Sequence, residues 1–384
     1  MRATRASRPR PAIRSRISRR CSNAAAARAD TVATSDDAAL DSLFLPLDVG
    51  EITLPPGEGG VLFLRARAGA WLHAWPRSVF TCEQGFKPAN DELAQYRLRA
   101  AAQVDADRRF PLVLVLPPRQ RDESRALLAR AIRHAAPGGI VVACQANSEG
   151  ARSGEADLAQ LAGPVRSLSR HKCRVFWSEP VGAHLDPALI DAWLALDAIR
   201  PILDGRYVSR PGLFAWDRID AASALLAEHL PSTLHGHVAD LGAGYGYLST
   251  ELVRRCERIQ AIDLYEAEQR ALEPARLNLE RAIAAAGRPV ATTQFWHDVA
   301  HGLERRYDAI VSNPPFHQGR ADRPELGQAF ITAAAKALRA DGELWLVANR
   351  HLPYEATLAA RFGEVRRVAE REGYKVIAAR GARA

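Results

Sequence analysis

The sequence predicts an α/β fold made of two tandem Rossmann-like units, each with a mainly parallel sheet covered by helices on both faces. Short apolar runs typical of buried strands alternate with stretches of helical spacing along most of the chain. The alternation is strongest from about residue 205 to the end, and 384 residues are enough for two domains. Such alternation is typical of strands and helices packed in layers.

The predicted elements follow the order of the chain. Residues 41–200 form the first unit, with strands at 61–64, 110–116, 140–144 and 174–177 and helices at 93–103 and 124–135. Residues 205–384 form the second unit, with strands at 237–241, 258–262, 292–296, 308–311, 343–347 and 375–379. Its predicted helices span 247–255, 266–286 and 325–339.

The two units also resemble each other in sequence. Residues 108–118 read Arg-Arg-Phe-Pro-Leu-Val-Leu-Val-Leu-Pro-Pro, and residues 305–315 read Arg-Arg-Tyr-Asp-Ala-Ile-Val-Ser-Asn-Pro-Pro. In both copies a helix, a glycine-containing turn and another strand follow. Two α/β domains can share such patterns by chance, but a duplication explains the shared order better. The copies differ where the first has Leu116 and the second has Asn313.

Composition excludes several classes of protein. Apolar residues make up 47% and charged residues 25%, as in a globular chain and unlike a wholly disordered or fibrous one. No apolar run approaches the roughly 20 residues that cross a bilayer, so no membrane association is expected. The five cysteines are scattered without a Cys-x-x-Cys pair, which disfavours a disulfide framework and a cysteine-bound metal. No metal is therefore expected, and the cysteine usage fits a cytoplasmic location.

A glycine-rich turn follows the predicted strand at 237–241. It contains Gly242, Gly244 and Gly246 and is preceded by Asp240. Glycines let the backbone approach a ligand closely, and the helix that follows offers free N–H groups to an electronegative group. The dinucleotide pattern G-x-G-x-x-G is not met, because Tyr247 stands at its third glycine. A G-x-G-x-G turn next to an acid suits a ligand with an amino-acid end and no pyrophosphate, namely S-adenosylmethionine.

Residues near the ends of the next two strands complete the predicted cofactor site. Asp263 is expected at the tip of its strand, where a carboxylate can accept both hydrogen bonds of a ribose diol. Leu264 or Tyr265 is expected to pack on the adenine, and Asp298 to meet the adenine amino group. Each residue alone has an ordinary structural explanation, but their order and spacing together favour cofactor binding.

The strand predicted at 308–311 leads into Asn313, Pro314, Pro315 and Phe316. Two successive prolines lack N–H donors and have a fixed φ, so they end the strand in a stiff, extended loop. In an open α/β sheet, ligands bind at this carboxyl edge. The plain alternative is a strand end with Phe316 in a core, and the nearby glycine turn makes the functional interpretation the better one.

These residues suit methyl transfer to the exocyclic amino group of a base. Such a group is a poor nucleophile because its lone pair is delocalised into the ring. The side-chain oxygen of Asn313 and the carbonyl of Pro314 can hold its two N–H bonds and turn the lone pair toward the methyl sulfonium. Catalysis is then mostly orientation and charge placement. Phe316 can stack on a base turned out of its helix.

Residues from about 205 to 380 resemble the class I S-adenosylmethionine-dependent methyltransferases of the small methyltransferase group. Within that group they are similar to the ribosomal RNA small subunit methyltransferase C family. The resemblance rests on residues 240–247, on Asn-Pro-Pro-Phe-His at 313–317 and on Val-Ala-Asn-Arg-His-Leu-Pro-Tyr at 347–354. The Asn-Pro-Pro-aromatic tetrapeptide alone is shared with DNA adenine and protein glutamine methyltransferases. Ala222 departs from the pattern, in which a glycine is usual within the segment that covers the cofactor.

The resemblance implies two tandem class I methyltransferase domains, the first of which has lost cofactor binding and helps to hold the RNA. It implies an enzyme that uses S-adenosylmethionine to methylate the N2 amino group of a guanine in 16S ribosomal RNA. The expected partner is ribosomal RNA or the small ribosomal subunit, and a monomer is expected. A 23S rRNA guanine-N2 methyltransferase and a catalytically idle RNA-binding scaffold remain alternatives. A DNA adenine enzyme is disfavoured because no target-recognition insert is found.

Residues 1–40 show no strand or helix periodicity and are predicted to be disordered. The first 29 residues contain nine arginines and no acidic residue. The whole chain has 52 basic and 44 acidic residues, so the net charge of +8 belongs to this tail and the remainder is nearly neutral. A transit peptide, a flexible arm that touches RNA and a start codon assigned too far upstream all remain open. Twin-arginine secretion is disfavoured because no convincing apolar stretch follows Arg19 and Arg20.

Overall fold

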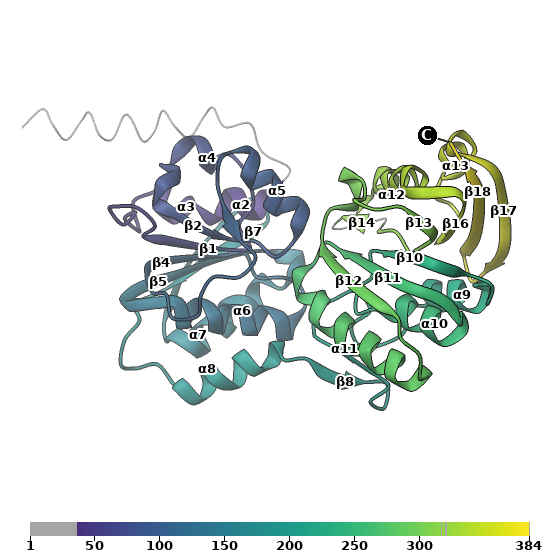
Figure 1. Ribbon diagram of the computed structural model, residues 1–384. Helices are drawn as coiled ribbons and strands as arrows, with labels where there is room; N and C mark the ends of the chain where they lie inside the picture. The colour runs from purple at the N-terminus through teal and green to yellow at the C-terminus, as the bar shows by residue number, and fades with distance from the viewer. Residues whose placement is uncertain (1–36, 316, 319–320, 384) are drawn as a thin grey trace, which may run out of the picture.

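The computed structural model describes residues 37–315, 317–318 and 321–383. It contains two seven-stranded sheets with flanking helices, arranged as two domains side by side (Figure 1). The predicted α/β fold with two tandem units is confirmed. Residues 1–36 of the tail expected to be disordered lie outside the described residues. The expected boundary at residue 40 is wrong, because Ala38–Leu43 form a helix capped by Asp37 that buries Leu40.

The first domain consists of one sheet, the helices that cover it and short connecting turns. Its helices are α2 (Ala38–Leu43), α3 (Leu45–Asp48), α4 (Trp71–Ala74), α5 (Lys87–Gln95), α6 (Arg121–His134), α7 (Ala151–Ala162) and α8 (Pro187–Leu194). Its 3-10 turns are η1 (Arg77–Val79), η2 (Asn147–Glu149) and η3 (Ala195–Asp197). Its strands are β1 (Val61–Leu64), β2 (Phe80–Glu83), β3 (Ala100–Ala101), β4 (Phe110–Val115), β5 (Ala135–Ala146), β6 (Val165–Arg170) and β7 (Cys173–Ser178).

The second domain follows a short hairpin of β8 (Arg200–Ile202) and β9 (Tyr207–Ser209). Its helices are α9 (Ala221–His229), α10 (Tyr247–Arg255), α11 (Gln269–Ala286), α12 (Pro324–Ala337) and α13 (Glu355–Arg361), with a 3-10 turn η4 (Val299–His301). Its sheet strands are β10 (His235–Leu241), β11 (Arg258–Glu266), β12 (Ala291–Trp296), β13 (Tyr307–Ser312), β16 (Leu338–Asn349), β17 (Phe362–Arg371) and β18 (Tyr374–Ala382). A small separate hairpin is formed by β14 (His317–Gln318) and β15 (Ala321–Asp322).

The two sheets have the same topology. Their strand orders are β3-β2-β1-β4-β5-β7-β6 and β12-β11-β10-β13-β16-β18-β17. The first five strands of each order are parallel. The sixth strand, β7 or β18, is antiparallel to both of its neighbours. The register agrees as well, because Leu64 pairs with Val115 in the first sheet and Leu241 pairs with Ser312 in the second. Val115 and Ser312 hold the same place in the repeated sequence. Shared order, direction and register are what a duplication produces.

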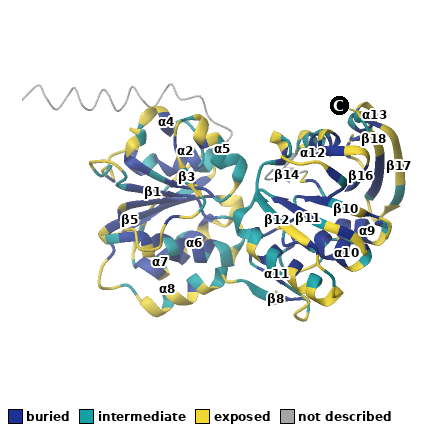
Figure 2. Ribbon diagram, viewed as in Figure 1, coloured by how far each residue is buried: buried dark blue, intermediate teal, exposed yellow. Residues whose placement is uncertain are grey.

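Each sheet buries a separate apolar cluster on each face, so its central strands are covered on both sides (Figure 2). In the second sheet, Val238 and Val311 contribute to the cluster that contains residues of α10 and α11. Their neighbours Ala239 and Ile310 contribute to the cluster on the other face, with residues of α12. Strands buried on both faces are nearly continuous apolar runs, which explains why the sequence predicts the central strands well.

Several predicted element boundaries are wrong, and those near the site are the most consequential. The helix expected at 93–103 is α5, which ends at Gln95 and is followed by the short strand β3. Arg97 between them has φ 59°, a left-handed conformation that ends a helix. The strand expected at 258–262 continues to Glu266, because residues 261–266 pair with 291–296 of β12. Consequently α11 begins at Gln269 rather than at 266.

The domains contact each other through equivalent loops. The carbonyl of Gly85, just after β2, accepts hydrogen bonds from the backbone N–H of Gln269 and from the indole N–H of Trp296, both at 2.9 Å. The N–H of Lys87 donates to the carbonyl of Ala267 at 2.8 Å. Because β2 and β11 hold the same place in their sheets, the carboxyl edges of the two sheets meet at this contact (Figure 1).

The described residues contain no membrane-spanning helix and no metal-binding cluster, and their cysteines are free thiols. None of their helices is long and apolar enough to cross a membrane. The same residues include no group of three or more His, Cys, Asp or Glu placed to hold a metal ion. Cys82, Cys144, Cys173 and Cys256 are buried free thiols.

Candidate active site

The glycine turn connects the carboxyl end of β10 to the first residue of α10. Gly242, Gly244 and Gly246 all have positive φ, at 75°, 56° and 87°. At Gly246 a Cβ would also stand 3.2 Å from the Cα of Ala275 in α11, so only glycine allows the two helices to approach this closely. At Gly244 nothing lies within 4 Å of that position, and the turn is open toward the cleft. The turn is therefore packed against α11 at Gly246 and open to the cleft at Gly244.

Asp240 lies beneath this turn and is fully buried. Its Oδ2 accepts hydrogen bonds from the N–H and the hydroxyl of Ser249 in α10, at 3.1 and 2.7 Å. Its Oδ1 is buried with no hydrogen-bond partner among the described residues. Burial raises the pKa of this carboxyl group to about 7, because the charged form is poorly solvated. A buried acceptor under a glycine turn is suited to an ammonium group or an ordered water.

Asp263 does not lie at the tip of its strand, where the sequence predicts it. It is three residues before the end of β11, 1% exposed, and its Oδ2 accepts a hydrogen bond from the hydroxyl of Tyr307 at 2.8 Å. The same oxygen lies 3.1 Å from Arg305 Nη1 and 3.0 Å from His237 Nε2. A carboxylate enclosed within the sheet by these partners cannot reach a ribose at the rim. The expectation that it stands at the strand tip is wrong, because the strand is longer than its apolar run.

Glu266 occupies the strand tip instead. Its Oε2 accepts from the N–H of Gly244 at 2.7 Å and its Oε1 accepts from the N–H of Glu268 at 2.8 Å. Burial is the main cause of a raised pKa at this carboxyl group, and the backbone N–H groups oppose it. The carboxylate thus joins the glycine turn to the end of the neighbouring strand. The sequence pattern does not reveal this position of Glu266, because its spacing predicts a helix from residue 266 onward.

The residues expected to pack on an adenine are part of the core. Leu264 is fully buried in the apolar cluster under α10 and α11. Tyr265 is also fully buried, stacked on Phe295 at 4.5 Å, and its hydroxyl lies 2.7 Å from that of Tyr307. Neither side chain is at the rim, so both expectations are corrected. The cause is again that β11 continues past these residues.

Asp298 does lie at the carboxyl rim, two residues after β12. Its Oδ1 accepts from the N–H of Ala300 at 2.9 Å and so caps η4. His301 Nδ1 is 3.2 Å from its other oxygen. The strand ends place Asp298 beside Glu266, since the N–H of His297 donates to the carbonyl of Glu266 at 2.9 Å.

Asn313 follows β13 directly and lies beside the glycine turn. Its Nδ2 donates to Asp220 Oδ2 and to Ser223 Oγ, both at 2.9 Å. A carboxylate can only accept, so the amide nitrogen must face Asp220, and the amide oxygen is left as an acceptor for another molecule. The backbone oxygen of Asn313 is 3.9 Å from the position of a Cβ at Gly242. The two predicted halves of the site therefore meet at one rim of the sheet.

The other members of the tetrapeptide are placed differently. Pro314 is buried and Pro315 is exposed. The end of β13 is fixed to β10 by Ser312, whose hydroxyl donates to the carbonyl of Leu241 at 2.8 Å. Phe316 lies outside the described residues.

The segment at 211–223 covers the site, and its chemistry went partly unrecognised in the sequence analysis. Phe214 is 64% exposed and lines the cleft. Asp220 caps α9 by accepting from the N–H of Ser223 at 2.9 Å and holds Asn313 with the same oxygen. An Asp-x-x-Ser sequence at a helix start predicts the cap but not the contact with residue 313. The cleft residues are Phe214, Ala215, Asp220, Ser223, Gly242, Ala243, Gly244, Tyr245, Tyr247, Leu248 and Asn313.

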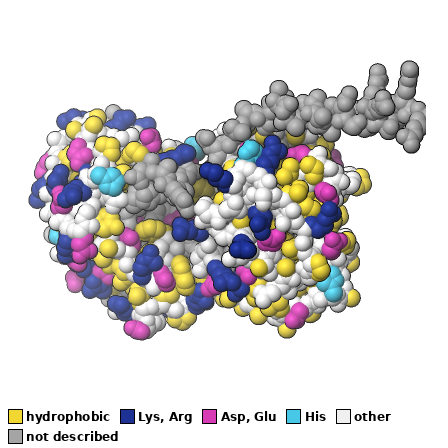
Figure 3. All heavy atoms as spheres, turned by 180° about the vertical axis from the view of Figure 1, so that it is seen from behind, with side chains coloured by type: hydrophobic (Ala, Val, Ile, Leu, Met, Phe, Trp, Pro, Cys, Tyr) yellow, Lys and Arg dark blue, Asp and Glu magenta, His cyan; other side chains and the backbone are white. Residues whose placement is uncertain are grey.

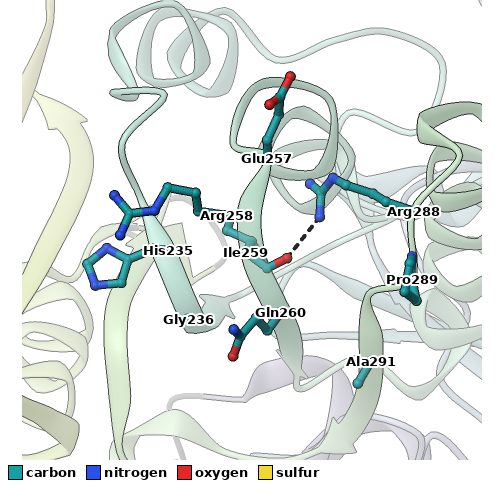
Figure 4. A pocket seen from close by; sticks show the side chains of 9 residues that line it. All are labelled: His235, Gly236, Glu257, Arg258, Ile259, Gln260, Arg288, Pro289 and Ala291. Carbon is teal, nitrogen blue, oxygen red and sulfur yellow. Dashed lines mark hydrogen bonds between the residues drawn. The ribbon is translucent and has the colours of Figure 1, made fainter.

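A second hollow lies at the opposite edge, at the amino ends of β10, β11 and β12 (Figure 4). Its lining includes His235, Arg258 and Arg288. The guanidinium of Arg288 donates to the backbone carbonyl of Ile259 at 2.8 Å and to two further carbonyls. Its charge and donors are used to hold the backbone. Because the glycine turn and Asn313 are at the carboxyl edge, this hollow is not the candidate site.

Known proteins show the same fold and the same sequence family. The family model described as "Methyltransferase small domain" matches residues 204–378. A protein of Pseudomonas paraeruginosa named "Ribosomal RNA small subunit methyltransferase C" is 32% identical over 316 residues, which cover 76% of this chain and 92% of the relative. A protein of the same name from Shewanella amazonensis is 29% identical over 284 residues, 74% of this chain and 81% of the relative.

A solved structure is similar over both domains. It is the 16S rRNA N2 G1207 methyltransferase of T. thermophilus in complex with AdoMet and guanosine. The TM-score is 0.71 at 26% identity, with 91% of this chain and 93% of the other chain covered.

The fold and the site thus define an S-adenosylmethionine-dependent methyltransferase with a small methyltransferase domain. The agreement with the relatives extends over both domains and most of their length. The chain belongs to the ribosomal RNA small subunit methyltransferase C family.

Proposed function

We propose that this protein transfers the methyl group of S-adenosylmethionine to the N2 amino group of a guanine in 16S ribosomal RNA. The observation that carries the proposal is the fixed amide of Asn313 beside the glycine turn. The two relatives bear the name of a ribosomal RNA small subunit methyltransferase, and the T. thermophilus protein is described with AdoMet and guanosine. These findings favour a small-subunit guanine over a 23S substrate or an idle scaffold.

The residues of the second domain fit the cofactor. The turn from Gly242 to Gly246 offers backbone N–H groups and an open outer side. The unpartnered Oδ1 of Asp240 is a buried acceptor for the ammonium of the methionine end. Glu266 takes the ribose role that the sequence assigned to Asp263, because its carboxylate is at the strand tip. Asp298 stands at the neighbouring strand end for the adenine amino group.

The chemistry asked of the protein is orientation. S-adenosylmethionine supplies an electrophilic methyl group on a positively charged sulfur. The Asn313 oxygen and the Pro314 carbonyl accept the two N–H bonds of the guanine amino group and turn its lone pair toward that methyl group. Phe316, which lies outside the described residues, keeps the role expected from the sequence, stacking on the guanine ring. The protonated product loses its proton readily, so no strong general base is required.

The partner is 16S ribosomal RNA or the small subunit that contains it, and the protein acts as a cytoplasmic monomer. The first domain contributes no cofactor site, because Arg65 and Arg67 stand at the places of Gly242 and Gly244. Leu116 likewise replaces Asn313. One active site per chain follows.

Asn313→Ala tests the proposed reaction. Methyl transfer from labelled S-adenosylmethionine to unmethylated 16S RNA or small subunits is expected to fall at least a hundredfold, because the amino group loses its acceptor. Cofactor affinity, measured by calorimetry, is expected to stay within about threefold. Digestion of the RNA product and mass spectrometry identify the methylated guanine, beginning with the equivalent of G1207.

Gln260→Ala is the matched control, since it removes an exposed amide at the opposite edge of the same sheet. It is expected to keep wild-type turnover. Turnover by Asn313→Ala at the wild-type rate would remove the proposed mechanism. Methylation of 23S rather than 16S RNA by the wild type would replace the proposed substrate.

A further inference from the structure

The first domain has a loop at the same place as the glycine turn of the second. The matched register aligns Leu64 with Leu241, so the residues that follow them correspond one by one. Arg65 then stands at the place of Gly242, and Arg67 at that of Gly244. Arg65 has φ 55°, close to the 75° of Gly242. The turn has kept its left-handed geometry at this residue although an arginine has replaced the glycine.

The two arginines have different surroundings. Arg67 lies 2.8 Å from Asp37 Oδ2, and burial lowers the pKa of its guanidinium. Arg65 is exposed and makes no hydrogen bond or ion pair with a described residue. A non-glycine residue with positive φ is strained, and no hydrogen bond or ion pair with a described residue compensates that strain at Arg65. Its guanidinium attracts the carboxylate of Glu123 electrostatically, but Glu123 is paired with Arg270. The cation of Arg65 is available to a molecule outside the chain.

Further cations lie along the same edge of the first sheet. Arg119 follows the prolines at the end of β4, Arg152 is in the first turn of α7 after β5, and Lys172 is in the turn that enters β7. All three are exposed and form no ion pair with a described residue. Four unpaired cations thus occupy the carboxyl ends of β1, β4 and β5 and the adjacent turn.

The acidic residues of this edge do not cancel that charge. Glu83 is buried and held by Arg130 at 2.6 Å, and Glu123 faces Arg270 of the second domain at 2.6 Å. Asp122 is paired with Arg200 at 2.9 Å. Glu149 is an exposed acid of this edge that forms no ion pair with a described residue. The edge is therefore basic, although the body of the protein is nearly neutral.

The position of this edge connects it to the active site. The carboxyl edges of the two sheets meet at the backbone contact between Gly85 and Gln269. Lys and Arg side chains are present on both sides of the junction between the domains (Figure 3). A polyanion whose target base occupies the cleft at Asn313 has the first domain's edge next to it.

We propose that the carboxyl edge of the first sheet, with Arg65 and Arg119 at its centre, binds backbone phosphates of the RNA that flanks the target guanine. This rests on the proposed function, since it assigns the vestigial cofactor site of the first domain to the same substrate. Arginine and lysine at strand ends bind phosphate by charge and by N–H donors, without reading the base sequence. Arg65, which stands where the glycine turn of the second domain has Gly242, is thus one of the groups that hold the substrate.

Charge reversal at two sites, R65E/R119E, tests the proposal in the full-length protein. The probe is unmethylated 16S RNA transcribed in vitro, with small subunits lacking the methyl group as the second substrate. RNA affinity at about 0.1 M salt is expected to fall at least tenfold, and the slope of log K against log salt to lessen by roughly 0.7–0.9 for each phosphate that the variant no longer binds. KM for RNA is expected to rise with kcat and cofactor affinity unchanged. A neutral variant, R65N/R119Q, is expected to show a smaller loss, since Asn tolerates positive φ.

R99E/R258E is the matched control. It reverses two exposed arginines that form no ion pair with a described residue: Arg99, directly before the edge strand β3, and Arg258, the first residue of β11 at the amino edge of the second sheet. It is expected to bind RNA within threefold of the wild type. An equal loss in both double variants, or wild-type affinity and salt slope in R65E/R119E, overturns the proposal. If the wild type methylates neither substrate, the proposed function fails, while the salt slopes still test the edge by itself.

Discussion

At the scale of single residues, the site depends on how one amide is oriented. Asn313 can present either its oxygen or its nitrogen to a substrate, and only the oxygen can accept a hydrogen bond from an amino group. Asp220 and Ser223 decide the choice by accepting both N–H bonds of the amide. In the proposed mechanism Asp220 is thus a positioning residue, which acts on the substrate through Asn313.

Substituting Asp220 should lower turnover while substrate binding is retained. Asp220→Ala is expected to reduce kcat about tenfold or more with KM for RNA within threefold, because the amide oxygen is no longer held in one direction. Asp220→Asn keeps an acceptor for the amide and is expected to recover most of the loss. Steady-state methyl transfer with both variants measures this.

The helix cap supplied by Asp220 needs its own control. Losing an N-cap costs about 1 kcal/mol of stability. Asp186→Ala removes the comparable cap of α8, where Asp186 Oδ1 accepts from the N–H of Ala188 at 2.9 Å, and is distant from the site in sequence and element. It should keep the wild-type kcat. A similar loss of kcat in both Ala variants would show that stability rather than orientation is responsible.

At the scale of elements, the glycine turn works because α10 and α11 pack against each other beneath it. Gly246 is required twice, once for φ 87° and once because Ala275 leaves no room for a Cβ. Glu266 joins the turn to the end of β11 through the N–H of Gly244. The surface that we propose for the cofactor is thus fixed by the packing beneath it.

Comparing two glycines separates backbone strain from packing. Gly246→Ala is expected to lower the free energy of unfolding by about 2 kcal/mol or more, since the new Cβ adds a steric clash to the strain. Gly287→Ala, at φ 65° after α11 with nothing within 4 Å of the Cβ position, should lower it by about 1 kcal/mol. Denaturant unfolding measures both. Equal losses would mean that the close approach to Ala275 contributes nothing.

At the scale of the whole molecule, the first domain supports the cover of the active site. Arg270 in α11 donates to Glu123 of the first domain at 2.6 Å and to the carbonyl of Pro211 at 2.8 Å, and it also pairs with Asp197. Gly212, next to Pro211, packs so closely on Glu123 that a Cβ would lie 2.0 Å from its Oε2. The guanidinium of Arg270 therefore binds residues of the first domain and of the segment that covers the cleft.

Removing the guanidinium of Arg270 should lower the melting temperature of the two-domain protein. Arg270→Ala leaves the carboxylates of Glu123 and Asp197 near each other without a cation, which is expected to cost about 2 kcal/mol. Arg276→Ala on the same helix removes an exposed arginine paired with Glu273 and Glu280, and its melting temperature should match the wild type. Calorimetric melting of both variants checks this. Equal melting temperatures would show that the contact between domains carries no stability.

The glycine turn and Asn313 could be predicted from the sequence, whereas the acid at the tip of β11 could not. The glycine turn and Asn313 follow apolar runs that are unmistakably strands, and strand ends in a parallel sheet share one edge. Glu266 was missed because the last residues of β11 are polar and aromatic and read equally well as a helix start. Asp263 was misplaced for the same reason, since its burial with Tyr307 and Arg305 depends on partners more than 40 residues away.

The sequence by itself determined the α/β class, the duplication, the family and the two motifs of the active site. These features can be predicted because each depends on residues close together in the chain: the apolar periodicity, the glycine spacing and the Asn-Pro-Pro run. Only the tertiary structure decided which acid stands at the rim, which way the amide of Asn313 faces and what the arginines of the first domain have replaced. Those depend on strand register and on contacts between segments far apart in the chain, and such contacts leave no local pattern in the sequence.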